Sequence, residues 1–166
     1  MLDPRQFLRF VIRPALDAMQ LGGASAEVLL LGTGLAESNQ LTSLRQIGKD
    51  GRDGPARGLF QMEPATHDDI WDRYLNPSVA RIDLVYKACG IGENRGSDML
   101  MWNLRYAAAM TRFHYLRVAE PIPAAHDAEA MAQYHKRHYN TALGKADPAR
   151  NVQHFLLANS IVGQTR

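Results

Sequence analysis

Residues 25–38 have the sequence SAEVLLLGTGLAES, an apolar run that ends in a glutamate. Ser25 is a favoured N-cap residue and Glu27 would place a negative charge in the first turn, so the run predicts a helix from Ser25 to Glu37. At the C-terminal end of this helix the dipole disfavours negative charge, and the apolar residues before Glu37 would partly desolvate its carboxyl group. Both effects favour the protonated carboxyl that a general acid needs. A solvated glutamate at a helix end is the competing interpretation.

Helical signals continue on both sides of this run. Asp3 and Pro4 have the order of an N-cap and a first-turn proline, and residues 98–118 carry apolar side chains around most of a helix circumference, as a buried helix does. Gly32 favours close packing of another helix over a phosphate-binding turn, because no strand precedes it. The predicted helices are 7–19 (ended by Gly22 and Gly23), 25–37, 64–75, 77–86, 98–118 (the longest), 126–139 and 148–161.

Residues 39–55 differ in composition, with Gly48, Gly51 and Gly54 separated by charged residues. Glycine and aspartate in this arrangement are typical of turns, and the flanking segments 44–47 and 56–61 are predicted to pair as a short hairpin. No repeat or low-complexity segment interrupts the chain. The sequence therefore predicts one α+β domain over residues 1–166, predominantly α, with a small β-hairpin near the glutamate that ends the apolar run.

The overall composition excludes few function classes. The 166 residues are 46% hydrophobic and 22% charged, as in soluble globular domains, and the net charge of +2 favours anionic polymers without distinguishing cell wall from nucleic acid. The apolar run 28–35 is too short to span a membrane, and arginines interrupt the apolar N-terminal segment, so neither a membrane span nor a secretory signal is expected. Cys89 is the single cysteine, so no internal disulfide can form.

Histidines and tryptophans supply weaker candidates. His135 and His138 share one face of a predicted helix and allow a metal site, but the two basic residues between them would repel a cation and no third ligand is evident. A solvated basic patch is therefore favoured over a metal site at this position. Trp71 and Trp102 fall at core-type helical positions, where packing is favoured over stacking on a sugar.

Four short segments follow one another in an informative order. Glu37-Ser38 is followed by residues 58–66 (GLFQMEPAT), then by Asn103-Leu104, and finally by Tyr139-Asn140 with Gly144 beyond. This ordered set resembles the soluble lytic transglycosylases of the lysozyme-like superfamily, over roughly residues 25–145. The resemblance implies a lysozyme-like fold and an enzyme that cleaves the β-1,4 bond between N-acetylmuramic acid and N-acetylglucosamine in peptidoglycan.

The resemblance also implies roles for individual residues. Glu37 would be the single acid/base, giving a proton to the leaving oxygen and then taking one from the 6-hydroxyl of the muramic acid, which closes a 1,6-anhydro ring. Ser38 would orient the substrate or the glutamate. Tyr139 would hydrogen-bond to Glu37 and position it, and Asn140 would contact sugar or brace its loop.

The same resemblance assigns the segment after the hairpin to the wall of a cleft. Gly58 and Gln61 would shape that wall, and Phe60 would fill an apolar cleft position where the family usually has methionine. The chain departs from the family pattern elsewhere: His138 stands where alanine is preferred, and three residues rather than one separate Asn140 from the glycine that follows.

Asp50 and Asp53 leave a second mechanism open. A lysozyme-type hydrolase needs a second carboxylate to activate water, and these two residues lie in the extra chain length between Glu37 and Gly58. Their sequence context, Lys-Asp-Gly and Arg-Asp-Gly, is also that of ordinary turns, which favours the transglycosylase. A structural virion protein that keeps the fold with an idle cleft is a further alternative.

The resemblance also implies which partners the protein has, and the expected lack of a secretory signal indicates how it reaches the cell wall. The substrate would be peptidoglycan glycan strands, with no cofactor, no metal, no nucleic acid and no membrane span. A stand-alone catalytic domain without a signal peptide suits a bacteriophage virion component, in contact with other virion proteins, or a lysis enzyme released through a membrane hole.

Overall fold

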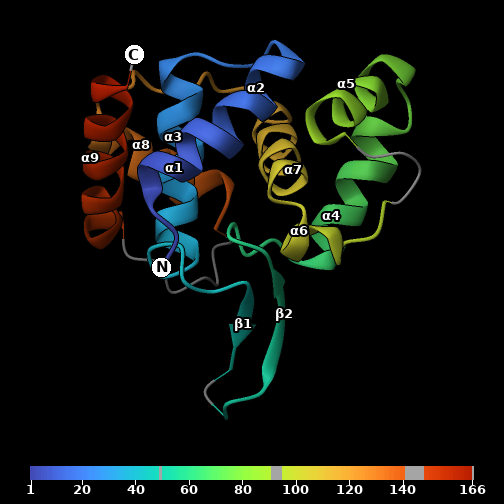
Figure 1. Cartoon of the computed structure of the whole chain (residues 1–166), viewed down its shortest axis with the longest axis horizontal. Helices are drawn as coiled ribbons and strands as arrows, with labels where there is room; N and C mark the ends of the chain where they lie inside the picture. The colour runs from blue at the N-terminus through green and yellow to red at the C-terminus, as the bar shows by residue number, and fades with distance from the viewer. Residues whose placement is uncertain (49, 91–94, 141–147, 166) are drawn as a thin grey trace.

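Helix α3 (Ala24–Glu37) lies between α9 (Pro148–Gln164) and α7 (Leu104–Leu116) in the helical body (Figure 1). The structure, a computed structural model, describes residues 1–48, 50–90, 95–140 and 148–165. Helix α8 packs on α9, whereas α4 and α5 lie on the far side of α7. The described elements are, in chain order, α1 (Pro4–Phe7), η1 (Leu8–Ile12), α2 (Arg13–Met19), α3 (Ala24–Glu37), β1 (Arg45–Ile47), β2 (Asp53–Arg57), α4 (Pro64–Ile70), η2 (Trp71–Leu75), α5 (Val79–Cys89), α6 (Met99–Trp102), α7 (Leu104–Leu116), α8 (Ala128–His138) and α9 (Pro148–Gln164). The prediction of a predominantly helical α+β chain is confirmed.

Helix α3 is buried from Ala26 to Leu35. A Cβ at Gly32 would lie 2.3 Å from Cδ1 of Phe155, so only glycine allows α9 to approach this closely, and the predicted helix contact is confirmed. The predicted cap is wrong: α3 begins at Ala24, one residue before Ser25, and no side chain caps it. Gly23 occupies the N-cap position with φ 115°, a conformation that glycine adopts without a steric penalty.

The first predicted helix is present but contains a π-helical turn, η1. The N–H of Arg13 donates to the carbonyl of Leu8, five residues back. Pro14 follows directly; it has no N–H and its ring would crowd the carbonyl four residues back, which a wider turn relieves. The side chain of Asp3 caps the helix start as predicted, accepting from the N–H of Gln6 at 2.9 Å. The last helical residue is Met19, as predicted, but the left-handed residue that ends the helix is Gln20 (φ 57°) and neither of the two glycines.

The long helix predicted over 98–118 is wrong, because the chain leaves the helical conformation at Asn103. Asn103 has φ −110° and ψ 92°, and its side-chain oxygen accepts from the N–H of Tyr106 at 3.0 Å, so it ends α6 and caps α7. Apolar residues continue on both sides of this single-residue break, and periodicity therefore does not register it. Trp102, expected in the core, is 61% exposed beside the break.

Strands β1 and β2 form an antiparallel hairpin that projects from the helical body (Figure 1). Arg45 lies opposite Arg57 and Ile47 opposite Asp53, with an irregularity in register between the two pairs. The predicted hairpin is therefore present, although its second strand begins at Asp53 rather than within 56–61.

Gly58 fixes the base of the hairpin. Its φ is +74°, and a Cβ here would lie 2.1 Å from the carbonyl oxygen of Leu100, so no other residue fits. The neighbouring Arg57 donates to the hydroxyl of Ser97 and pairs with Asp98 at 2.9 Å between Nη1 and Oδ1. These contacts hold the base of the hairpin against the start of α6.

Candidate active site

Glu37 is the last residue of α3, and its side chain is 18% exposed. Directly after it the chain turns sharply, with Asn39, Gln40 and Leu41 all at positive φ (50°, 58° and 63°). Three successive non-glycine residues in the left-handed region are strained, and such strain gathers at functional sites. Backbone hydrogen bonds hold the turn, including Gln40 N–H to the carbonyl of Leu35 at 2.9 Å. Leu41 is buried, which anchors the turn in the core.

Ser38 supports this turn and does not face a substrate. It is fully buried, and its hydroxyl donates to the carbonyl of Gly34 at 2.7 Å. Its own carbonyl accepts from the N–H groups of Thr42 and Ser43, at 2.9 and 3.1 Å. The expectation that the Ser38 side chain orients the substrate or Glu37 is therefore corrected: it ends α3 and braces the turn.

The carboxylate of Glu37 meets two groups from the far end of α8. Nδ2 of Asn140 donates to Oε1 at 3.2 Å, and Nε2 of His135 lies 3.0 Å from the same oxygen. Oε2 has no hydrogen-bond partner within the described ranges. One oxygen thus contacts two side chains of the protein, and the other makes no hydrogen bond to a described residue.

His135 is the residue that the sequence interpretation missed. It was expected in a solvated basic patch, but it is fully buried, so that interpretation is wrong for this residue. His138 does not share its environment, because it binds Oε2 of Glu120 at 2.8 Å. A signal was available: Met131 precedes His135 by four residues and Ala132 by three, so the apolar face of the helix contains the histidine.

The imidazole of His135 lies between aromatic rings, and neither of its nitrogens makes a hydrogen bond to any described residue. The ring stacks on Tyr139 (centroids 5.6 Å apart, 18° between planes) and is tilted against Phe155 (5.7 Å, 54°). At 3.0 Å, Nε2 is within ion-pair distance of Glu37, but its N–H direction misses the geometry of a hydrogen bond.

Tyr139 does not hydrogen-bond to Glu37 as predicted. Its hydroxyl donates to the carbonyl of Phe60 at 2.8 Å, and its ring stacks on Tyr115 as well as on His135. Burial raises the pKa of the Tyr139 hydroxyl far above its usual range, so the group stays protonated and remains a donor. Tyr139 therefore orients the histidine ring and ties the end of α8 to the segment after the hairpin.

The predicted cleft-wall residues are placed differently from one another. Phe60 is fully buried against Phe7, with ring centroids 5.8 Å apart, so its role as an apolar cleft surface is corrected to core packing. Gln61 is half-buried at φ 47°, and its Nε2 donates to the carbonyl of Gly58 at 2.8 Å. This contact stiffens the segment after the hairpin, and no hydrogen bond joins it to Glu37 in the described part of the chain.

Asp50 and Asp53 lie on the exposed outer part of the hairpin, which points away from the helices (Figure 1). The carboxylate of Asp50 accepts from the N–H of Arg52 at 3.2 Å, as an aspartate in a turn does. Asp53 begins β2 opposite Ile47. No ion pair or hydrogen bond joins either aspartate to Glu37 among the described residues.

A second buried histidine, His67, shows what a fully bonded site in this molecule looks like. Its Nε2 lies 2.6 Å from the hydroxyl of Tyr106, and its Nδ1 lies 2.8 Å from Oδ1 of Asp68. Nε1 of Trp71 donates to the same tyrosine hydroxyl at 2.7 Å, and Trp71 is buried as predicted. Burial lowers the pKa of His67, partly offset by the bond to Asp68, which favours the neutral ring.

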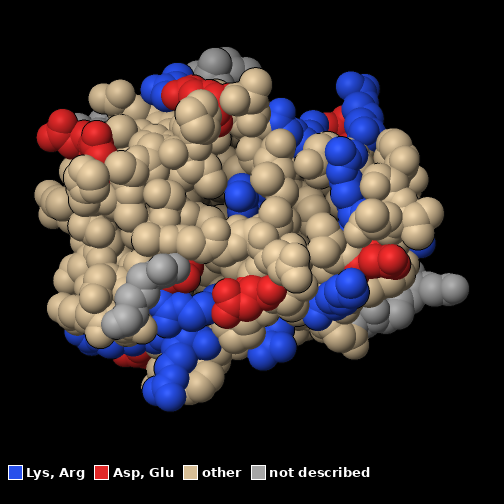
Figure 2. Space-filling model, turned by 90° about the horizontal axis from the view of Figure 1, so that it is seen from above, with Lys and Arg blue, Asp and Glu red and all other residues tan. Residues whose placement is uncertain are grey.

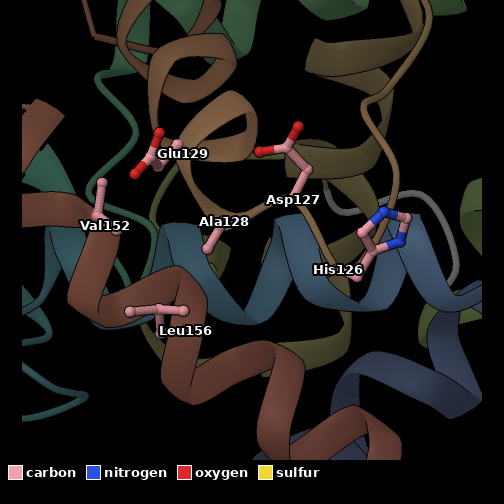
Figure 3. A pocket seen from close by; sticks show the side chains of 6 residues that line it. All are labelled: His126, Asp127, Ala128, Glu129, Val152 and Leu156. Carbon is pink, nitrogen blue, oxygen red and sulfur yellow. The ribbon is translucent and has the colours of Figure 1, made fainter.

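The surface supplies a hollow elsewhere, at the start of α8 (Figure 3). It has a volume of about 340 Å³, and its lining consists of His126, Asp127, Ala128, Glu129, Val152 and Leu156. Asp127 is committed to capping α8, accepting from the N–H of Ala130 at 2.9 Å. The hollow lies at the opposite end of α8 from the groups that meet Glu37, so it is separate from the candidate site.

The charged side chains on the surface do not indicate a particular ligand. Figure 2 shows acidic and basic side chains next to one another on one face, among large uncharged areas. Ion pairs such as Arg137 with Glu120, at 2.7 Å, account for part of this mixture. In the described ranges, no group of three or more His, Cys, Asp or Glu side chains is arranged to hold a metal ion, and no helix is long and apolar enough to cross a membrane.

Gly144, the last residue of the fourth sequence segment, lies outside the described residues. The other three segments and Tyr139-Asn140 are described: Glu37 and Asn140 are in contact, Tyr139 stacks on the histidine beside them, and Asn103 caps α7. Comparisons with known proteins found no matching family model, no matching curated protein and no matching solved structure.

Proposed function

We propose that this protein cleaves peptidoglycan glycan strands as a lytic transglycosylase, with Glu37 as its single acid/base. The observation that carries the proposal is the state of that carboxylate: it ends a buried helix, Asn140 and His135 converge on Oε1, and Oε2 has no hydrogen-bond partner among the described residues. The order of the sequence segments, which resembles the soluble lytic transglycosylases, supplies the substrate class.

The reaction needs one carboxyl group that is first an acid and then a base. Protonated Glu37 gives its proton to the glycosidic oxygen as the bond between that oxygen and C1 of the muramic acid breaks. The resulting carboxylate takes the proton of the 6-hydroxyl, whose oxygen bonds to C1 and closes the 1,6-anhydro ring. The proton returned to Glu37 equals the proton it gave, and no water is consumed.

The positions of the other carboxylates support the transglycosylase over the hydrolase. An inverting hydrolase needs a second carboxylate roughly 6.5–9.5 Å from the acid to hold the attacking water. Asp50 is occupied in its own turn, and Asp53 is exposed at the start of β2. An internal nucleophile, the substrate's 6-hydroxyl, removes the need for either.

The test is to digest purified peptidoglycan and identify the products by mass spectrometry. We expect fragments that end in 1,6-anhydro-muramic acid, one water lighter than hydrolysed ends. Glu129→Gln, an exposed glutamate at the other end of α8, is the matched control and should give the same products. Reducing ends would make the enzyme a hydrolase, and the absence of any cleavage by wild-type protein would leave the idle structural protein as the better account.

A further inference from the structure

Burying the imidazole of His135 without hydrogen bonds costs free energy, so packing alone does not explain why a histidine occupies this position. Few buried polar atoms in proteins lack a partner, and each such atom calls for an explanation. The ring of His135 is fully buried, and neither of its nitrogens has a hydrogen-bond partner within the described part of the chain. A phenylalanine would fill similar space among the same aromatic neighbours without leaving polar atoms unpaired, so the imidazole must be explained by what it faces.

What the ring faces is Glu37. Nε2 lies 3.0 Å from Oε1, and the aromatic contacts with Tyr139 and Phe155 keep the ring in its plane. Phe155 is itself seated against Gly32 of α3, the helix that ends at Glu37. The ring nitrogen is therefore already within hydrogen-bond distance of the carboxylate, and only the direction of its N–H differs from that of a hydrogen bond.

The groups around the ring limit what it can exchange a proton with. Glu37 faces it from the end of α3 and Tyr139 from the end of α8, while the ring contact from α9 is the uncharged Phe155. Tyr139 stays protonated and uses its hydroxyl on the carbonyl of Phe60. Among these contacts, Glu37 is the group whose charge changes in the proposed reaction.

We infer that His135 is a positioning residue for Glu37: in the Nε2–H form it donates to Oε1, together with Asn140, and so directs the catalytic proton to Oε2. This inference rests on the proposed function. When Oε2–H gives its proton to the glycosidic oxygen, the charge that appears on the carboxylate is met by two donors already in place. The histidine keeps its proton throughout, so the balance of the reaction is unchanged.

Three variants test this inference kinetically. His135→Phe removes the donor and keeps an aromatic ring. We expect kcat to fall by about ten- to a hundred-fold, which is less than the roughly 10²–10³-fold loss for a donor that contacts the substrate directly, with KM changed less than about twofold. Because an ionised carboxylate without this donor is less stable, the alkaline limb of the kcat–pH profile should move to higher pH. His135→Gln, which can still donate an N–H, should recover part of kcat and return the limb towards its original position.

His67→Gln is the matched control, since His67 is also buried but is bonded at both nitrogens, and it belongs to α4, which lies on the far side of α7 from α3. It should lower thermal stability while leaving kcat and the alkaline limb unchanged. A purely structural role for His135 predicts the same pattern for His135→Phe and His135→Gln: lower stability, no shift of the limb and no advantage of glutamine. That outcome would overturn the inference.

A second measurement separates this inference from the proposed function. Nitrogen-15 NMR of wild-type protein reports the tautomer of His135 and the chemical shift of Nε2, without any substrate and without relying on the folding of a His135 variant. We expect the Nε2–H tautomer, and a changed Nε2 chemical shift in Glu37→Gln. If wild-type protein leaves peptidoglycan intact, the proposed function fails while NMR still decides whether the two side chains interact. An Nδ1–H tautomer, or an Nε2 chemical shift that is unchanged in Glu37→Gln, would refute the pairing even in an active enzyme.

Discussion

The surroundings of His67 and of His135 contain the same kinds of side chain, yet they are bonded in opposite ways. Each histidine is buried beside a tyrosine and a carboxylate. Around His67, the imidazole, the phenol of Tyr106 and the indole of Trp71 all find partners within hydrogen-bond distance. Around His135, the tyrosine turns its hydroxyl elsewhere and both ring nitrogens lack a hydrogen bond among the described residues.

The difference separates stability from chemistry. A closed network holds each proton in one place and cannot accept a new charge without breaking a bond, so it suits the packing of α4 and η2 against α7. The carboxylate beside His135 keeps one oxygen uncommitted, and such a group can change its protonation state while its neighbours stay where they are. Four predictions, ordered by decreasing size of the expected effect, test this comparison.

The largest expected effect is on activity in Glu37→Gln. The amide cannot donate a proton to the glycosidic oxygen, so the rate of peptidoglycan cleavage should fall at least ~10²-fold, the usual scale of general acid catalysis. The side chain is partly exposed and keeps its shape, so thermal unfolding should be nearly unchanged. A folded variant that retains activity would remove Glu37 from the mechanism.

Tyr106→Phe should have the reverse pattern. It takes away the hydroxyl that Nε2 of His67 and Nε1 of Trp71 both use, leaving two buried groups unpaired. At about 1–3 kcal/mol for each, the free energy of unfolding should fall by roughly 2–6 kcal/mol, measured by denaturant titration. Cleavage by the fraction that remains folded should be close to that of wild-type protein; a large loss in kcat would show that the two regions are coupled.

The third effect is a pH dependence of stability. An unfolded histidine has a pKa of about 6.5, and burial lowers the pKa of His67 in the folded chain, although the bond to Asp68 raises it in part. Between the two pKa values the unfolded chain therefore binds a proton at His67 and the folded chain does not. The contribution of neutral His67 to the free energy of unfolding is complete above about pH 6.5 and is lost as the pH falls towards the lowered folded pKa. Since burial also lowers the pKa of His114, His67→Gln should flatten the acid decline without abolishing it.

The smallest effects are expected in the hairpin. Asp50→Asn and Asp53→Asn should each keep activity within about twofold and change stability by less than about 0.5 kcal/mol, as surface substitutions do. Inactivation by either variant, together with reducing-end products, would bring a second carboxylate into the mechanism.

The sequence predicts local features of this molecule well and long-range contacts poorly. The hairpin is found at its glycine-rich turn, Asp3 caps the first helix, and Gly32 marks a close helix contact, since each depends on backbone chemistry within a few residues. The sequence does not predict the break at Asn103, because the apolar residues on both sides of it keep the spacing of a continuous helix.

The candidate site divides in the same way. Glu37 at a helix end is a local property, and the structure places it there. The partners of Tyr139 and Ser38, and the burial of Phe60, are decided by which distant segment each side chain meets, and the predictions for all three required correction. His135 was missed because a basic sequence context concealed its position on the apolar face of α8.

The contact between Gly32 and Phe155 has a consequence for the order in which the molecule is made. A ribosome that has completed α3 has produced the acid, but the residues that surround it lie about a hundred positions later, and the ring that seats against Gly32 later still. Contacts of such separation form slowly, because a long loop must close before they contribute. A growing chain therefore carries Glu37 without these neighbours until about a hundred further residues have been added, and the site becomes complete only after α9 has docked.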